Sequence, residues 1–454
     1  MQHIRMLLVG LVAAGAPLAA AAADRQECFS IVAGRAATAC GGVLFAHNED
    51  NALEDAAGFW MFPRANAAGA SAYACLAMPG CPESDVLLNE HGVAIASDNC
   101  PSREDRPELA GGGIAGPELR HRVAREARTA RQGVEIIGAL VDRVGYAVSG
   151  RTYLIADPRE GWLVAVVHGK HWVAARVPDD AVAVIANTYT IGEVDLADGA
   201  RFLGSHDLVE YATRRGWHDP SKEPFSFEKA YADQNTRVAA SNTHRAWRGL
   251  ARIAAGAVPA PGSAPVPFCI KPASPVTVAS LAAVLRDHYE GTSFAAPAGV
   301  SPHNGPVRTI CVPRTNSASV FQLRASQPAP IGIVWWLCLC QPCSNPFVPL
   351  YPWAGPPPAA YGFDAGNAAA PGAPAYRLFG DHARRIDADY EKRIVEARRR
   401  LHAIEDATYA LQPAVEEAAR AAWAANPDRA RELLTRFSWG TIGRAVEAAE
   451  TPQR

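Results

Sequence analysis

The chain has 454 residues, of which 49% are hydrophobic and 20% are charged, and this is enough material for a large buried core. Its formal net charge is -2, so composition gives no sign of the basic surface that nucleic acids or anionic membranes attract. These values are typical of a soluble globular protein, and we expect no nucleic-acid partner.

The N-terminus has the layout of a secretory signal. Residues 1–5 carry one positive charge, residues 6–20 are almost entirely apolar, and Ala21, Ala22 and Ala23 supply the small residues that signal peptidases require. The apolar part is shorter than the roughly 20 residues of a membrane helix, which leaves an uncleaved anchor as the alternative. We expect residues 1–23 to be removed and the protein to be periplasmic or secreted, with no membrane association afterwards.

Two short apolar segments follow the signal. Residues 28–34 and 43–48 read as strands, and a turn that ends in two glycines separates them. An antiparallel hairpin centred near Thr38 would place residue 28 opposite residue 48. The sequence His-Asn-Glu-Asp at 47–50 would then lie beside the start of the first strand.

The next part of the chain predicts one helix and four strands. Residues 117–144 carry apolar side chains at three- and four-residue spacing, which is typical of an amphipathic helix. Four apolar segments follow with short connections, so we expect them to pair as an antiparallel meander: 151–156, 161–167, 171–177 and 181–187.

The C-terminal part is predicted to be helical. Residues 276–291 read as a helix that ends at Gly291, and residues 386–404 show one apolar face of a longer helix. Asn426 and Pro427 are typical of an N-cap followed by proline at the first helical position. We therefore predict a helical extension over 375–454 that packs on the core or on a partner subunit of a homo-oligomer.

Ten cysteines become interpretable if the chain is exported, because oxidising compartments permit disulfides. With Cys28 set aside, nine remain, so at least one more is unpaired or bonded between molecules. Cys75 with Cys81 is the favoured local pair. The Cys-x-Cys-x-x-Cys sequence at 338–343 could hold a soft metal, but no matching cluster lies nearby in sequence. We therefore expect no metal and no cofactor.

Cys28 admits three interpretations. A lipoprotein cysteine requires small residues before it, whereas Arg25, Gln26 and Glu27 stand there. A disulfide half is the second interpretation. The third is an N-terminal nucleophile that release of residues 24–27 exposes, in which the thiol attacks and the free α-amino group serves as its base.

Six further segments follow the N-terminal order of Cys28, strand, Gly-Gly turn, strand and His-Asn-Glu-Asp, and they are 88-LNEHGVAIASDN-99, 126–146, 153–195, 241-SNTHRAWRGL-250, 285-LRDHYEGT-292 and 308-RTICVPRTNSASVFQLR-324. This series, which runs from residue 28 to about 361, resembles the secernin and bacterial dipeptidase family of N-terminal nucleophile hydrolases. The resemblance implies an α+β fold, a four-layer αββα sandwich with two antiparallel sheets face to face. We expect that domain to span 28–374.

The resemblance also implies site residues near the N-terminus. Cys28 matches the nucleophile, and Asp50 matches the acidic residue that ends the Arg-x-x-Asp pattern of the wider superfamily. His47 stands where that pattern usually has arginine, and an imidazole is a weaker, pH-dependent cation that could stabilise a thiolate or orient substrate. Cys40 stands where an aspartate usually precedes glycine, which implies a disulfide with another cysteine.

Further site residues follow from the later motifs. Asn99 and Asn187 match asparagines that bind oxygen or substrate in related acylases, and either could instead cap a turn or a strand edge. Asn89 begins the Asn-Glu-x-Gly motif and is assigned to substrate binding. Arg245 matches an arginine near the catalytic cysteine, although Arg248 is close enough to compete.

The function implied is hydrolysis of short peptides, most simply dipeptides, through a Cys28 thioester. The oxyanion would be held by Asn99 or by a backbone N–H. One alternative is an amidase that cleaves a non-peptide amide. Another, of a different class, is an exported disulfide-rich binding protein in which Cys28 is bonded.

Overall fold

The computed structural model describes residues 27–51, 57–64, 69–262, 265–363, 367 and 369–451, with backbone alone for 81–85. The predicted signal segment 1–23 and residues 24–26 of the predicted propeptide lie outside this part. Among the described residues, no helix combines the length and the apolar character that crossing a bilayer requires.

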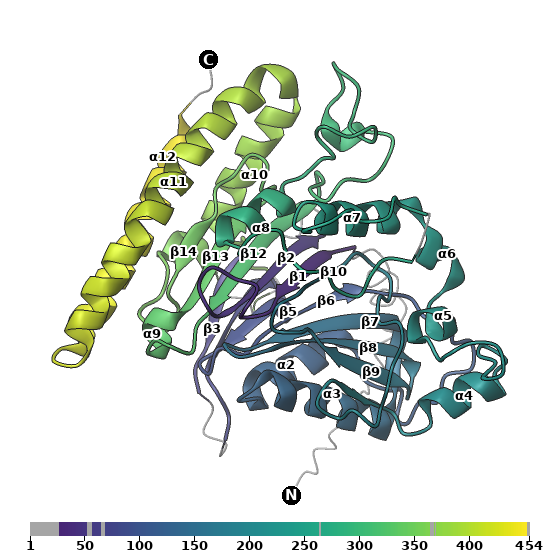
Figure 1. Cartoon of the computed structure of the whole chain (residues 1–454). Coiled ribbons are helices and arrows are strands. Elements are labelled where there is room, and N and C mark those ends of the chain that lie inside the picture. The colour runs from purple at the N-terminus through teal and green to yellow at the C-terminus, as the bar shows by residue number, and fades with distance from the viewer. Residues whose placement is uncertain are drawn as a thin grey trace, which may run out of the picture.

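Two antiparallel sheets form the centre of the molecule (Figure 1). The six-stranded sheet runs in the order β10 (Val182–Ile185), β1 (Phe29–Ala33), β2 (Val43–Asp50), β12 (Thr315–Leu323), β13 (Ile333–Leu339) and β14 (Val348–Leu350). The eight-stranded sheet runs in the order β11 (Phe202–Gly204), β9 (Trp172–Arg176), β8 (Gly161–Gly169), β7 (Tyr146–Ala156), β6 (Ala94–Asn99), β5 (Cys81–Asn89), β4 (Tyr73–Met78) and β3 (Gly58–Phe62).

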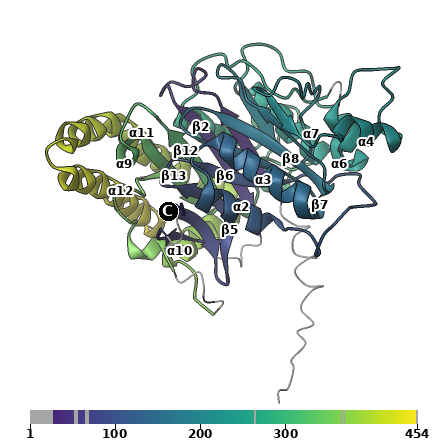
Figure 2. The ribbon, with the colours of Figure 1, turned by 90° about the horizontal axis from the view of Figure 1, so that it is seen from below.

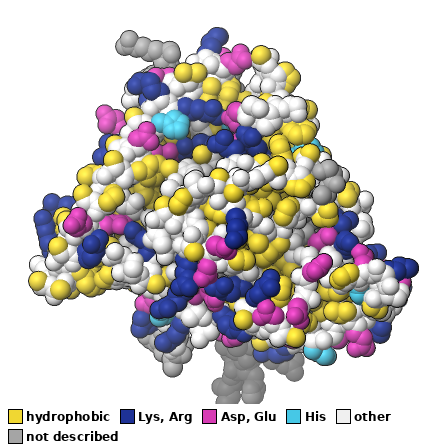
Figure 3. Space-filling model, viewed as in Figure 1, with side chains coloured by type: hydrophobic (Ala, Val, Ile, Leu, Met, Phe, Trp, Pro, Cys, Tyr) yellow, Lys and Arg dark blue, Asp and Glu magenta, His cyan; other side chains and the backbone are white. Residues whose placement is uncertain are grey.

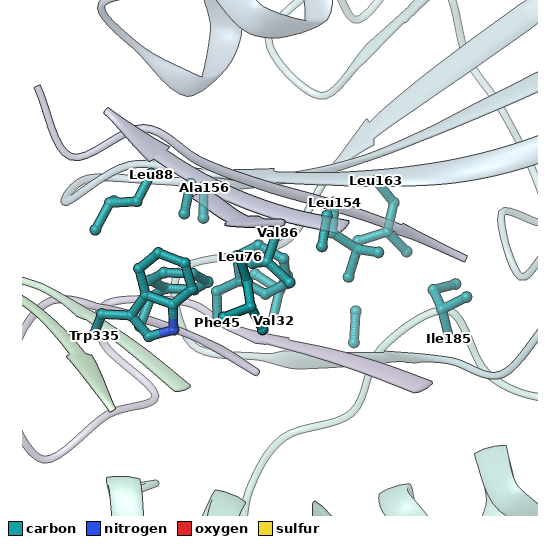
Figure 4. Packing of buried hydrophobic residues seen from close by; sticks show 14 of the residues in the cluster. Val32, Phe45, Leu76, Val86, Leu88, Leu154, Ala156, Leu163, Ile185 and Trp335 are labelled. Carbon is teal, nitrogen blue, oxygen red and sulfur yellow. The ribbon is translucent and has the colours of Figure 1, made fainter. Parts of the chain in front are cut away.

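The two sheets face each other across a shared apolar core (Figure 4). Val32, Phe45 and Trp335 from the six-stranded sheet and Leu76 and Leu154 from the eight-stranded sheet are 0% exposed. Strand alternation explains this arrangement, because every second side chain of β1 and β2 points to the same face. The other face of each sheet must therefore be covered by helices.

Helices cover both outer faces, which gives the four layers αββα (Figures 1 and 2). On the six-stranded sheet lie α7 (Ala240–Ala251) and α8 (Val278–Leu285), and on the eight-stranded sheet lie α2 (Gly116–Glu126) and α3 (Ala130–Val144). The predicted fold class is confirmed. The remaining short helices are α4 (Leu208–Arg214), α5 (Phe227–Tyr231), α6 (Gln234–Val238), α9 (Ala329–Gly332), η1 (Pro302–Asn304) and η2 (Ala359–Tyr361).

Three predicted elements of the sandwich differ from the structure. The helix predicted over 117–144 is two helices, because the chain becomes extended at Ala127 and Thr129 caps the second helix by accepting from the Gln132 amide. The helix predicted to end at Gly291 stops at Leu285. The fourth strand of the predicted meander, β10, crosses to the other sheet and pairs with β1.

The C-terminal extension is three helices, α10 (Pro374–Asp387), α11 (Tyr390–Trp423) and α12 (Pro427–Glu450). The helix is interrupted between Asp387 and Tyr390, so the apolar face predicted over 386–404 is divided between α10 and α11. Asn426 caps α12 by accepting from the Arg429 amide, as predicted. The extension packs beside β13 and β14 (Figure 1).

A buried ion pair joins the extension to the sandwich. Arg286, at the end of α8, donates two hydrogen bonds of 3.0 and 2.8 Å to the carboxylate of Glu405 on α11. The Phe347 amide also donates to Glu405, at 2.8 Å. The carboxylate therefore holds a side chain and a backbone group of the sandwich at once.

Replacing Glu405 by glutamine is expected to lower the free energy of unfolding by about 3–5 kcal/mol, because the Arg286 charge stays buried without a counterion. Denaturant unfolding measures this loss. The double variant Arg286→Met, Glu405→Leu is expected to recover most of the stability. A loss below about 1 kcal/mol, which is typical of exposed pairs, would contradict the proposed role of this ion pair.

The surface is mixed in charge. On the face shown in Figure 3, acidic and basic side chains are interspersed among apolar ones. This agrees with the net charge of -2.

Candidate active site

Cys28 directly precedes β1 and lies at one end of the space between the sheets. Its side chain is 0% exposed, and its thiol donates to Glu49 Oε1 at 3.5 Å. The register of the hairpin explains this contact. Phe29 pairs with Asn48, so residue 28 lies opposite residue 49 rather than residue 48, one position from the predicted register.

Glu49 begins a chain of buried polar groups. Its other oxygen lies 3.0 Å from His47 Nε2, and His47 Nδ1 lies 2.7 Å from Ser30 Oγ. Ser30 in turn donates to Asp98 on β6 of the opposite sheet, at 2.5 Å. The network therefore links Cys28 to both sheets.

The hydrogen bonds around His47 define which ring nitrogen faces each of its partners. Ser30 gives its one hydroxyl proton to Asp98, so His47 Nδ1 must donate to Ser30, while Nε2 faces the Glu49 carboxylate. His47 thus connects Ser30 and Glu49 through its two ring nitrogens.

Buried charges set the protonation of the cysteine and its neighbour. Burial, followed by the charges of Glu49 and Asp98, raises the pKa of the Cys28 thiol well above its ordinary value. Burial also opposes ionisation of Glu49, but the hydrogen bond and charge of His47 outweigh it and hold the pKa of Glu49 below its ordinary value. The thiol is therefore neutral while the Glu27–Cys28 peptide bond is intact.

Arg245 on α7 anchors the backbone of Cys28. It is 0% exposed, and it donates to the Cys28 carbonyl at 2.9 Å and to Asn187 Oδ1 at 2.8 Å. Asn187 Nδ2 in turn donates to the carbonyl of Asn99 at 2.9 Å. Arg248, the alternative, points elsewhere and pairs with Asp287 at 2.7 Å.

The two asparagines reach this group in different ways. Asn187 directly follows β10 with a φ of 57°, a left-handed conformation that asparagine tolerates better than most residues. Asn99 contributes its backbone carbonyl, while its side-chain Oδ1 is buried without a partner among the described residues. That oxygen can accept a hydrogen bond from a ligand.

Asp50 lies at the end of β2 beside the residue that precedes Cys28. It accepts from Thr315 Oγ1 at 2.6 Å and forms an ion pair with Arg308. Arg308 Nη2 also donates to the carbonyl oxygen of Glu27 at 2.8 Å. The Glu27 carboxylate contacts both Arg308 and Arg314.

Asn89 does not join the other predicted site residues. Its amide is fully used within a turn, donating to the Ala124 and Ala127 carbonyls and accepting from two backbone amides. Asn89 lies next to the start of β6, and about 16 Å of strand separate that start from Asn99. In the structure, the Asn89 side chain therefore stabilises a turn.

Sequence reasoning missed five residues of the site: Ser30, Glu49, Asp98, Arg308 and Arg314. A usable signal existed for Glu49, because His47 and Glu49 are two apart on a strand and so share a face. The predicted disulfide of Cys40 is wrong in this structure, since that thiol is free among the described residues and contacts Thr38 and Gly42. The predicted Cys75–Cys81 pair involves a side chain outside the described ones.

Cys28, His47 and Glu49 also bring three ligand atoms within 4.8 Å of one another. Thiolate, imidazole and carboxylate together can bind a divalent metal such as zinc. Because the same three groups also form the network of the thiol, a metal here would compete with nucleophilic chemistry.

The sequence profile of peptidase family C69 matches residues 89–400, which is more than half of the chain. The chain belongs to peptidase family C69. It is 30% identical over 247 residues to a protein named probable dipeptidase from Salmonella dublin, a match that covers 54% of this chain and 56% of the relative. A dipeptidase from Bifidobacterium longum is 29% identical, with 57% of this chain and 51% of the relative covered.

This C69 chain thus spans about half the length of the curated relatives that it matches. Among solved structures, a mutant of the conjugated bile acid hydrolase from Clostridium perfringens is similar over 71% of this chain and 92% of that chain. The TM-score is 0.38 and the identity is 9%, which is a weak likeness.

The pKa of the Asp98 carboxyl predicts that activity decreases on the acid side of the pH profile, its acid limb. Burial, the largest influence, raises the pKa of Asp98 to about 6, although His47 and Ser30 oppose it. Activity is expected to fall as pH drops through about 6, because protonation removes the negative charge of Asp98, which strengthens its hydrogen bond from Ser30 and its attraction to His47.

The raised pKa of Asp98 affects stability in the opposite direction to activity. Because the folded-state pKa exceeds the ordinary one, Asp98 favours folding at low pH, and this contribution is lost as pH rises toward 6. Asp98→Asn is therefore expected to remove the acid limb while leaving stability at pH 8 unchanged or higher. Profiles of kcat/KM and of unfolding against pH measure both, and an unchanged acid limb in Asp98→Asn would contradict this role.

Proposed function

We propose that this chain is an exported cysteine dipeptidase in which Cys28, once it is the N-terminal residue, is the nucleophile. The observation that carries the proposal is the placement of Cys28. Its thiol directly follows the Glu27 carbonyl, which Arg308 contacts, and its own carbonyl is anchored by Arg245. The relatives named dipeptidase support the substrate class.

The first step is release of the residues before Cys28. Its sulfur attacks the Glu27 carbonyl carbon, the C–N bond to Cys28 breaks, and the freed amine takes the thiol proton. Arg308, which donates to the carbonyl oxygen, stabilises the charge that develops there. Water then hydrolyses the thioester and releases the preceding segment, which now ends in the α-carboxylate of Glu27.

The second step repeats this chemistry on a dipeptide. The α-amino group of Cys28 accepts the thiol proton and passes it to the leaving amino acid, and water hydrolyses the thioester. The new ammonium group places a positive charge on the residue whose pKa burial and three carboxylates raise, which favours the thiolate. The amides of Asn99 and Asn187, or a backbone N–H, hold the oxyanion.

Two arginines favour a peptide over a neutral acyl amide. Arg308 and Arg314 both contact the Glu27 carboxylate, so its departure leaves two cations beside the nucleophile. A short peptide carries a C-terminal carboxylate that such a pair recognises. We therefore assign the C-terminal carboxylate of the substrate to Arg308 and Arg314.

The test compares dipeptides with their C-terminal amides and with N-acyl amides of similar size. We expect kcat/KM to be about 10- to 100-fold higher for the free carboxylate, the range of one charge-assisted contact. Arg314→Gln should raise KM for the dipeptide and leave the dipeptide amide unaffected. Faster turnover of N-acyl amides than of any dipeptide would overturn the assignment.

The binding-protein alternative requires Cys28 to be bonded. Among the described residues its thiol is free and faces Glu49. If Cys28 is the nucleophile, iodoacetamide is expected to abolish dipeptide hydrolysis, since alkylation blocks the thiolate.

A further inference from the structure

A second cluster of reactive side chains lies outside the network of Cys28. His288 follows α8, His303 lies in η1, Cys311 precedes β12, and Cys343 follows β13. Their ligand atoms all lie within 4.8 Å of one another. Cys343 is the last cysteine of the 338–343 motif, so the fold supplies the partners that the nearby sequence lacks.

Both histidines turn the same nitrogen toward the centre of the cluster. Their Nε2 atoms lie 3.1 Å apart, while His303 Nδ1 lies 2.9 Å from Asp387 and His288 Nδ1 lies 3.2 Å from Glu290. A carboxylate on Nδ1 keeps the proton there, so each Nε2 presents a lone pair. Two lone pairs that face each other are stabilised by a positive ion between them, either a proton or a metal ion.

The spacing agrees with tetrahedral coordination. Bonds of about 2.0–2.1 Å to nitrogen and about 2.3 Å to sulfur give N···N and N···S separations of about 3.3 and about 3.6 Å. The observed N···N separation is 3.1 Å, and the separations from His303 Nε2 to the Cys343 and Cys311 sulfurs are 3.7 and 3.9 Å. The cluster therefore has the dimensions of a metal site.

We propose that His288, His303, Cys311 and Cys343 bind one zinc ion in a closed structural site. Two thiolates and two imidazoles in a tetrahedron suit zinc, whereas calcium and magnesium require oxygen ligands. The protein fills all four positions and the side chains are buried, so no position is left for substrate. The ion stabilises the fold and performs no chemistry on the peptide.

The zinc joins segments that are distant in the chain. It links the loop after α8 to β13, and the His303–Asp387 contact extends the link to the end of α10. Cys311 lies between Arg308 and Arg314, the two residues that hold Glu27. Loss of the ion is therefore expected to loosen the segment that positions the cleavage site.

Metal analysis of the purified full chain, loaded with zinc under reducing conditions and then desalted, tests the proposal. We expect about one zinc per chain in the wild type and in Cys28→Ala, which excludes the Cys28 triad as the source. Cys343→Ser and His303→Gln should lose it. Cys338→Ser and Cys340→Ser, neighbours in the same motif but outside the cluster, should keep it.

Cobalt substitution keeps the test valid if a ligand variant fails to fold. The wild-type chain loaded with Co²⁺ should show the d–d bands of a tetrahedral ion together with sulfur-to-cobalt charge transfer. Three results would overturn the proposal. They are a wild-type chain without stoichiometric metal, full zinc content in folded Cys343→Ser, and a Cys311–Cys343 disulfide in peptide maps of the folded protein.

Discussion

Replacing Cys28 by alanine is expected to leave the Glu27–Cys28 bond uncut and to lower dipeptide hydrolysis by on the order of 10⁴-fold or more. Both steps of the proposed mechanism use the same sulfur, so one substitution removes both. The side chain is small, and among the described residues its sulfur makes one hydrogen bond, to Glu49, so the fold should be kept. Intact mass and a coupled amino-acid release assay measure the two effects.

Two further variants sharpen this prediction. Cys28→Ser keeps a weaker nucleophile and should accumulate precursor while processing slowly. Cys100→Ser serves as the matched control, because this buried cysteine follows β6 and packs in the core between the sheets. Wild-type activity of Cys28→Ala, or an equal loss in Cys100→Ser, would contradict the assignment of the nucleophile.

Arg245→Gln is the second change with a large expected effect, a fall in kcat/KM of about 10²–10³-fold. Arg245 holds the Cys28 carbonyl and Asn187 together, so glutamine leaves the nucleophile and one candidate oxyanion donor without a common anchor. It is a positioning residue, since it contacts the backbone of Cys28 and not the sulfur.

A purely structural role would give a different pattern. Removal of this buried cation should also shift the pH profile of Cys28 alkylation in the processed enzyme to higher pH, because a positive charge near the thiolate is lost. Arg248→Gln is the control from the same helix, with a similar loss of unfolding free energy and little change in that profile. An equal shift of the alkylation profile in both variants would contradict the positioning role and leave Arg245 a purely structural one.

The sequence predicts the framework of the site well, because it rests on local patterns. Residues 28–34 and 43–48 are mostly apolar and are joined by a turn that ends in Gly-Gly, and the hairpin forms as expected. The register is shifted by one residue, since a turn of eight residues does not define which pair closes it. That single step replaces Asn48 by Glu49 as the neighbour of Cys28.

Long-range contacts are what the sequence alone leaves open. Strand β10 follows β9 by a short connection, yet it crosses to the other sheet, because the edge of β1 requires a partner that local patterns do not reveal. Arg308 reaches Glu27 across 281 positions of the chain. Likewise, Cys343 and His288 are 55 positions apart, so a search for ligands near the 338–343 motif misses them.

The central claim, that Cys28 is the N-terminal nucleophile of the working enzyme, is tested most directly by the N-terminal sequence and mass of the active protein. The chain should be purified after export, and the species that an active-site alkylating agent labels should be analysed. We predict an N-terminus at Cys28, with one label on that residue and loss of dipeptide hydrolysis. Active protein that begins at Asp24, or that holds Cys28 in a disulfide, would contradict the claim.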